Sequence, residues 1–198
     1  PYPDPVVLRI DGYRIQPSLD EDSSGYTVSF ADTIIQPSSY VIYTPGTEKK
    51  PVQVIQVDDT GTFENPEDSD ILVITHPDFL QQAEEYKRSK EQDSLSVSIY
   101  TTDEIYNAFN YGEKSPYAIK SFLKYLFENT STPPSYLFFL GKGSYDPKNI
   151  LGSASDLIPV ILHSTPEGYF ASDYLYAFVN DDHYPDIIVG RLPCLTPS

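Results

Sequence analysis

The sequence has little or none of several residue types, and each shortage narrows the classes of protein to consider. Cys194 is the single cysteine, so no disulfide can form within the chain, and the redox compartment stays undecided. No apolar run approaches the roughly 20 residues that a helix needs to span a bilayer, so we expect no membrane span in this chain. Methionine is absent and no signal peptide is recognisable. We therefore expect a fragment, which begins inside a longer protein, is processed, or was cut to this length for expression.

Basic residues are also few. Lysine and arginine number 13 against 29 aspartates and glutamates, which gives a formal net charge of −16. Such a chain would repel phosphates, so we expect no nucleic-acid partner. The acidic side chains form a solvated surface or, in part, hold a divalent cation, because Ca²⁺ prefers oxygen ligands. Hydrophobic residues make up 39% of the chain, with 17 Tyr and 10 Phe, which is enough to build a core.

The first third of the chain has the pattern of β-structure. Short runs of β-branched and aromatic residues alternate with the Gly, Pro, Asp and Ser that turns require. We predict strands over 6–10, 25–30, 39–43 and 52–57. The segment 58–69, which contains Gly61, Pro66 and several acids, is the predicted linker. The sequence therefore predicts a small all-β domain over 1–66 and a second domain over 67–198.

The hydrophobic pattern changes after Asp70. Residues 71–74 form a continuous apolar run, which is typical of a strand covered on both faces of a parallel sheet. Helical spacing follows over 78–91 and 116–129, with a further helix between them that Thr101 or Thr102 can cap. Further strands are predicted over 95–100, nearer the sheet edge, and 136–140. This alternation predicts an open α/β sheet with right-handed crossovers.

The loop from Gly141 to Asp146 follows the most apolar strand, where ligands of open α/β sheets collect. A nucleotide-binding loop is disfavoured, because the Walker spacing is absent and no helix is predicted after Ser144. A G-x-S-x-G nucleophile elbow is absent as well. A turn that uses Gly for positive φ is the alternative interpretation.

Several short sequence motifs, in a fixed order along the second domain, carry a family resemblance. They are Ile74-Thr75-His76-Pro77, Glu104-Ile105-Tyr106, Ala118-Ile119-Lys120-Ser121-Phe122-Leu123, Leu140-Gly141-x-Gly143-Ser144-Tyr145-Asp146 and Gly190-Arg191-Leu192-Pro193. In this order the stretch from Ile71 to Pro193 resembles the first half of gingipain-type (family C25) cysteine peptidases, closest to the type IX secretion sortase branch. Residues 1–66 resemble the module that precedes the peptidase in sortase-like members. The resemblance implies a caspase-like, gingipain-like open parallel sheet as the first subdomain, preceded by a small all-β domain.

The resemblance implies a parent protein that is a cysteine endopeptidase or secretion sortase, extracellular or at the bacterial outer-membrane surface, with protein or peptide substrates. In that family the catalytic His and Cys lie in the half that follows, so this chain alone is expected to be inactive and to act as scaffold, with an open sheet edge where the missing C-terminal half docks. The alternative is a non-catalytic adhesion or interaction module that keeps the α/β scaffold.

The resemblance also implies a structural calcium ion. Val179 and Tyr184 would bind it through backbone carbonyls, and Asp182 and Asp186 through carboxylates. The family has an Asp at the position of Lys142, directly after the strand. Our hypothesis is that Lys142 replaces the ion by an internal salt bridge to the acidic loop. Calcium that persists with fewer ligands is the alternative.

The remaining candidate side chains have structural interpretations. Asp173 matches the family's Ser-Asp-x-x-Tyr and is interpreted as an acid that braces the loop. His76 is interpreted as a turn histidine, His163 carries no functional signal, and His183 beside Asp182 is interpreted as surface decoration rather than a general base. Cys194 is interpreted as a small packing residue. No catalytic residue is predicted in the chain.

Overall fold

The computed structural model describes residues 4–10, 12–50, 54, 63–64, 66–152, 156–180 and 182–197. The chain divides into two compact units, 1–56 and 57–198, which are described separately. The predicted strand over 52–57 and part of the predicted linker over 58–69 lie outside the described residues, so the domain boundary between 66 and 67 stays a prediction. Within the described ranges, no helix combines the length and apolar character that crossing a membrane requires.

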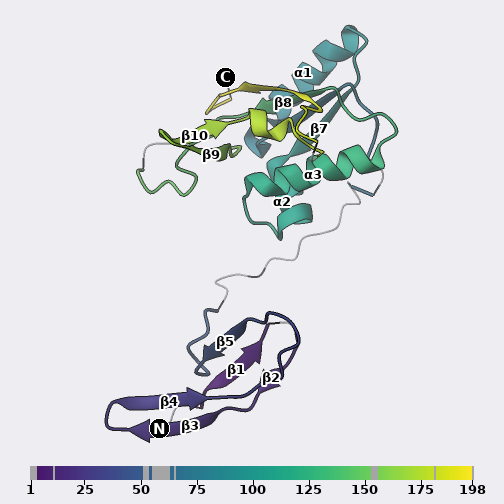
Figure 1. Ribbon diagram of the computed structural model, residues 1–198. Coiled ribbons are helices and arrows are strands. Elements are labelled where there is room, and N and C mark those ends of the chain that lie inside the picture. Colours follow the sequence, from purple (N-terminus) through teal and green to yellow (C-terminus); the bar gives the residue numbers. More distant parts are fainter. Residues whose placement is uncertain are drawn as a thin grey trace. The chain divides into compact units, whose positions relative to one another are not determined.

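The first unit contains small antiparallel sheets (Figure 1). Strands β1 (Val6–Arg9), β2 (Arg14–Ile15) and β5 (Tyr40–Tyr43) pair in the order β2-β1-β5. Strands β3 (Ser18–Asp22) and β4 (Gly25–Ser29) form a hairpin whose turn is closed by the Asp22 carboxylate, which accepts from the Ser24 N–H at 2.7 Å. The predicted strands at 6–10, 25–30 and 39–43 are confirmed. Sequence patterning did not find β3, because its residues Ser-Leu-Asp-Glu-Asp are nearly all polar.

The second unit is built on a four-stranded parallel sheet. Strands β6 (Ile71–Thr75), β7 (Val97–Thr101), β8 (Tyr136–Leu140) and β11 (Ile188–Leu192) lie in the order β11-β8-β6-β7. All five residues of β6 are buried, as the continuous apolar run predicts, and β7 lies at the edge of the described sheet. The predicted open parallel α/β sheet is therefore confirmed.

Capping residues set the helix boundaries. A 3-10 turn, η1 (Pro77–Phe79), leads into α1 (Leu80–Gln92). Helix α2 (Thr102–Asn110) is capped by Thr101, whose hydroxyl accepts from the Glu104 N–H while the Glu104 carboxylate accepts from the Thr101 N–H at 2.7 Å. Thr101 rather than Thr102 is therefore the cap. Helix α3 (Pro116–Asn129) begins with Ser115 as cap and Pro116 in its first turn, as the sequence predicts.

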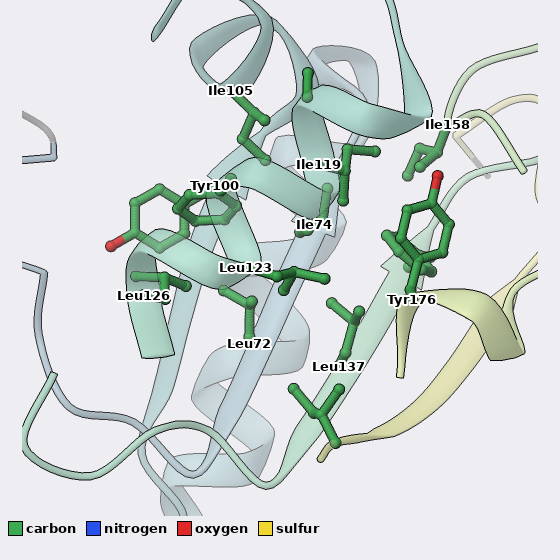
Figure 2. Packing of buried hydrophobic residues seen from close by; sticks show 14 of the residues in the cluster. Leu72, Ile74, Tyr100, Ile105, Ile119, Leu123, Leu126, Leu137, Ile158 and Tyr176 are labelled. Atoms are coloured by element: carbon green, nitrogen blue, oxygen red, sulfur yellow. The ribbon is translucent and has the colours of Figure 1, made fainter. Parts of the chain in front are cut away.

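The helices cover both faces of the sheet, because alternate strand residues point to opposite faces. On one face Leu72 and Ile74 pack with the buried residues of α2 and α3, such as Ile105, Ile119 and Leu123 (Figure 2). On the other face, a smaller cluster packs residues of β6 against α1 and the turn η1 that precedes it. The cluster contains Ile71, Val73, Phe79, Ala83, Val97 and Leu140.

The connection from β8 to β11 contains a second hairpin, β9 (Ile161–Thr165) and β10 (Gly168–Ser172), and a 3-10 turn, η2 (Tyr174–Tyr176). Tyr176 anchors this connection in the larger core (Figure 2). Its hydroxyl donates to the Pro159 carbonyl at 2.8 Å, and its ring lies 5.0 Å from that of Phe139. Burial raises the pKa of Tyr176 well above its ordinary value, so the hydroxyl stays a donor.

Candidate functional site at the carboxyl end of the sheet

Three strand ends and their loops define the candidate site. In register, Thr75 of β6 lies beside Leu140 of β8, and Leu140 lies beside Leu192 of β11. Because the strands are parallel, the loops that follow them leave from the same edge. In open α/β sheets this carboxyl edge is where ligands and catalytic groups collect.

An arginine–carboxylate pair fixes the β11 side of this edge. Arg191 donates from Nε to Asp173 Oδ2 and from Nη2 to Asp173 Oδ1, both at 2.7 Å. The pair is bidentate, which is the strong and geometrically specific form of such contacts. The Arg191 side chain is only 10% exposed, and its guanidinium lies 4.6 Å from the centroid of the Phe139 ring. Asp173 therefore braces the structure as predicted, with Arg191 as its partner.

The same guanidinium ties two loops to the sheet. Its Nη1 donates to the Gly141 carbonyl at 2.8 Å and to the Ile158 carbonyl at 3.0 Å. One side chain on β11 thus holds the end of β8, the segment before β9 and the start of η2. From the sequence, Arg191 is named only within the motif Gly190-Arg191-Leu192-Pro193 and is assigned no role. The available signal was that this motif contains a basic residue and that a second family motif contains an acid, Asp173.

Glycine is required at positions 141 and 143 after β8 for two different physical reasons. Gly141 has φ +147°, a conformation that other residues rarely adopt. A Cβ on Gly143 would lie 2.6 Å from Val160 Cγ1 and 2.8 Å from the Ile158 carbonyl oxygen. Close backbone approach therefore requires Gly143. Residues 141–152 contain no helix, so the loop presents no helix N-terminus to a phosphate, and the turn interpretation holds.

Lys142 extends the strand pairing through its peptide group. Its N–H donates to the Cys194 carbonyl at 2.9 Å, and its carbonyl accepts from the N–H groups of Leu157 and Ile158 at 2.9 and 3.1 Å. The predicted salt bridge of Lys142 to Asp182 or Asp186 does not form: among the described residues, no carboxylate lies within 4.0 Å of the Lys142 ammonium. Lys142 instead lines a cavity of about 290 Å³, together with Gly143, Ser144, Tyr145, Asp146, Val160 and Ala171.

The acidic loop is closed by Asp186. Its Oδ2 accepts from the N–H groups of Val179 and Asn180 at 2.8 and 2.9 Å, and its Oδ1 accepts from the Asn180 side-chain amide at 2.7 Å. Partial burial alone would raise the pKa of Asp186, but these three hydrogen bonds outweigh it and leave the pKa below its ordinary value. The Asp186 carboxylate therefore stabilises the loop through these three hydrogen bonds.

The residues implied as calcium ligands lie in this loop but are engaged differently. Both oxygens of Asp186 accept from N–H groups, and Asp182 Oδ1 accepts from the Tyr184 N–H at 3.0 Å. The Val179 N–H belongs to the Asp186 contact. In the part of the chain that the structure describes, no three His, Cys, Asp or Glu side chains are grouped so as to hold a metal. The predicted site uses two carboxylates and two backbone carbonyls, so this does not decide it, and calcium binding stays a prediction.

Among the described residues, Cys194 and the three histidines make separate contacts. Cys194 packs against the smaller core cluster, which agrees with the packing interpretation. His76 caps η1, where its Nδ1 accepts from the Asp78 N–H at 3.3 Å, which agrees with a turn histidine. His163 lies opposite Phe170 in the β9–β10 hairpin, and His183 has φ 67° in the acidic loop. Within the described residues, no histidine hydrogen-bonds Cys194, so no Cys–His pair is formed there.

The sheet, its helices on both faces and the braced carboxyl edge define an open parallel α/β domain. The family model for peptidase family C25 matches residues 64–198. The chain therefore belongs to peptidase family C25, which confirms the family resemblance.

Solved structures extend this comparison. Dimeric latent PorU from Porphyromonas gingivalis is similar with a TM-score of 0.70 at 14% identity, over 98% of this chain and 21% of the PorU chain. At that identity the likeness concerns the fold alone, and this chain spans about a fifth of PorU. The Arg-specific cysteine proteinase gingipain R (RgpB) aligns with a TM-score of 0.47 at 22% identity, over 64% of this chain and 24% of the other. No curated protein matches the chain.

Proposed function

We propose that this chain is a scaffold part of a C25 cysteine peptidase and that the catalytic His and Cys belong to another part of a longer protein. In this proposal a Cys thiolate attacks the peptide carbonyl with His as base, and the present residues position that machinery. The observation that carries the proposal is that Cys194 packs with apolar residues and is hydrogen-bonded by no described histidine, at a carboxyl edge that the Arg191–Asp173 pair braces.

The contacts of Cys194 and of the Arg191–Asp173 pair support a scaffold role for this chain. A nucleophilic cysteine requires a base within hydrogen-bond reach or another cause of a lowered pKa. Cys194 packs with apolar residues instead, and its carbonyl accepts from the Lys142 N–H at 2.9 Å. The Arg191–Asp173 pair, in contrast, gives the edge the rigidity that a catalytic constellation needs from its support.

The exposed side of β11 supports docking of a further part of the domain. β11 is an end strand of the described sheet. Ile188 and Leu192 are 64% and 52% exposed, and in register they lie beside Tyr136 and Leu140 on the face that carries α1. An uncovered apolar strand at a sheet edge is prone to pair or to be covered. We propose that the catalytic half occupies it.

A peptidase assay tests the proposal. The chain alone and its Cys194→Ala variant should both fail to hydrolyse fluorogenic peptides and to react with a thiol-directed active-site probe above background. A longer protein that contains this chain should hydrolyse them. Hydrolysis by the chain alone that is lost in Cys194→Ala would overturn the proposal.

We further propose a location at the bacterial surface, within type IX secretion, and protein or peptide substrates for the parent. Family membership and the PorU-like fold support this. Protease treatment of intact cells tests it: digestion of the parent without lysis is expected, and protection until lysis would contradict it.

A non-catalytic adhesion or interaction module is the second candidate. Lys142 favours it, because the family has an acid there and this lysine has no carboxylate partner among the described residues. The activity of the longer protein decides between the two: an inactive but folded parent would favour the module.

A further inference from the structure

A second cavity lies in the same unit, outside the site described above. It has a volume of about 430 Å³ and is bounded by helix α3, strand β9, the turn η2 and the acidic loop. Its lining residues are Tyr117, Lys120, Ile161, Leu175, Phe178 and His183.

The floor and walls of this cavity are apolar. Ile161 is buried in the main core cluster, and Leu175 packs against that cluster. Phe178 is held edge-on to Tyr174, with ring centroids 4.8 Å apart. Tyr117 is 66% exposed. A mostly apolar concavity with a few polar groups is the usual form of a small-ligand or side-chain pocket.

Besides the Tyr117 hydroxyl, the polar side chains of the described lining are the basic residues Lys120 and His183. Lys120 is half-buried on α3, and its neighbours three and four positions away are Tyr117, Leu123, Pro116 and Lys124, so no acid on its own helix can pair with it. Neither Lys120 nor His183 forms an ion pair with any described residue, and none of the described residues that line the cavity carries a carboxylate.

Two backbone features add to this. His183 has φ 67°, a costly conformation for a residue other than glycine, and such conformations cluster at binding sites. The cavity also borders the first turn of α3, where the positive end of the helix dipole favours an anion. In a chain of net charge −16, an apolar pocket whose described lining has Lys120 and His183 and no acidic side chain is a specific feature.

We propose that this pocket binds an apolar carboxylate, with the C-terminal residue of a peptide as the fitting example. The apolar side chain lies against Ile161, Leu175 and Phe178, and the carboxylate accepts from Lys120 and from His183. The site needs no catalytic residue, so it goes beyond the proposed peptidase scaffold and stands or fails separately from it.

Titration of the 198-residue chain tests the proposal, with N-acetyl-L-phenylalanine as probe and calorimetry or NMR as readout. The amide of the same probe lacks the charge, and N-acetylglycine lacks the apolar side chain. Both should bind at least tenfold more weakly, since the amide loses the charge-assisted hydrogen bond and N-acetylglycine loses the buried aromatic ring.

Variants assign the binding to this pocket. Lys120→Gln should weaken binding of the acid about tenfold and leave binding of the amide unchanged, and His183→Gln should weaken the acid as well. Lys124→Gln, one helical turn along on the exposed face, is the matched control and should bind like the unaltered chain. Circular dichroism confirms that each variant is folded.

Peptides then distinguish the source of the carboxylate. Tighter binding of a peptide with a free C-terminal phenylalanine than of the acetylated amino acid supports recognition of peptide C-termini. Equal binding supports a pocket for small free carboxylates. Equal affinity for acid and amide, no effect of Lys120→Gln, or no binding at all would overturn the proposal.

Discussion

At the scale of single residues, Arg191 has the most contacts at the carboxyl edge. Its guanidinium is nearly buried, meets both oxygens of Asp173 and donates to the carbonyls of Gly141 and Ile158. Removing one partner of such a pair leaves the other charge poorly solvated, which costs more than the pair itself contributes.

We therefore expect Arg191→Gln to lower the free energy of unfolding by about 3 kcal/mol, because glutamine leaves the Asp173 carboxylate without its charged partner. Native-state hydrogen exchange of the β8 and β11 amides measures this loss of stability within the second compact unit of the chain. A double-mutant cycle with Asp173→Asn should give a coupling energy of at least about 1 kcal/mol. Additive effects would show that the two residues act separately.

Asp186 gives a prediction on pH. Its pKa is below the ordinary value of 3.8, since hydrogen bonds from Asn180 and Val179 outweigh desolvation. A lowered folded-state pKa means that the carboxylate stabilises the fold above pH 3.8 and that this contribution is lost as the pH falls through the folded value. Asp186→Asn should cost about 1–2 kcal/mol at pH 7 and progressively less in acid, as urea denaturation would measure. A cost that is independent of pH would contradict this.

Lys142 gives a prediction on calcium. Lys142→Asp removes an ammonium and supplies the acid that the family has at this position, so calcium affinity should rise about tenfold in a calorimetric titration, equivalent to about 1.4 kcal/mol. Lys148→Asp, in the same loop but exposed, makes the same charge change and should have no such effect. An unchanged titration for Lys142→Asp would count against calcium binding at this loop.

At the scale of elements, β11 ends the described sheet and leaves two apolar side chains largely uncovered. Its Ile188 and Leu192 side chains lie on the face that carries α1 and remain more than half exposed. Helix α1 packs on β6 and β7, and Tyr86 of α1 reaches Phe138 of β8, with ring centroids 4.9 Å apart. The apolar face of β11 is therefore available to other chains.

We expect the chain to self-associate with increasing concentration, and Leu192→Lys to reduce this, because a lysine on an end strand discourages pairing. Sedimentation velocity over a range of concentrations measures it. Tyr111→Lys replaces a fully exposed aromatic residue outside the sheet and is the control. A chain that is monomeric at every concentration would contradict the prediction.

At the scale of the whole molecule, charge is the dominant property. The net charge of −16 is spread over two compact units, and like charges repel more in the folded state than in the expanded one. Added NaCl screens this repulsion. Raising the ionic strength from low to physiological should therefore increase stability by about 1 kcal/mol, or roughly 2–4 °C in Tm for a chain of this size. A Tm that falls over that range would indicate that attractive ion pairs dominate.

Much of the second unit was predictable because local chemistry and burial agree there. The apolar run at 71–74, the Ser115–Pro116 start of α3 and the stripe of Ile119, Phe122 and Leu123 all indicate their final structure. The β9–β10 hairpin was not predicted, since most of its residues are exposed and carry no clear alternation. The Lys142 salt bridge was wrong because sequence order does not say which groups satisfy Asp186, and nearby N–H donors do so first.

The sequence by itself determined the open α/β sheet, because the sheet follows from the period of the apolar residues. It likewise determined the helix caps, which depend on short-range hydrogen bonds, and the family, which depends on the order of short sequence motifs. The tertiary structure alone decided that Arg191 meets Asp173, that Cys194 packs against the smaller core cluster, and that Lys120 and His183 share one apolar pocket. Such contacts join residues far apart in the chain, and only the packing of the elements fixes the distances between them.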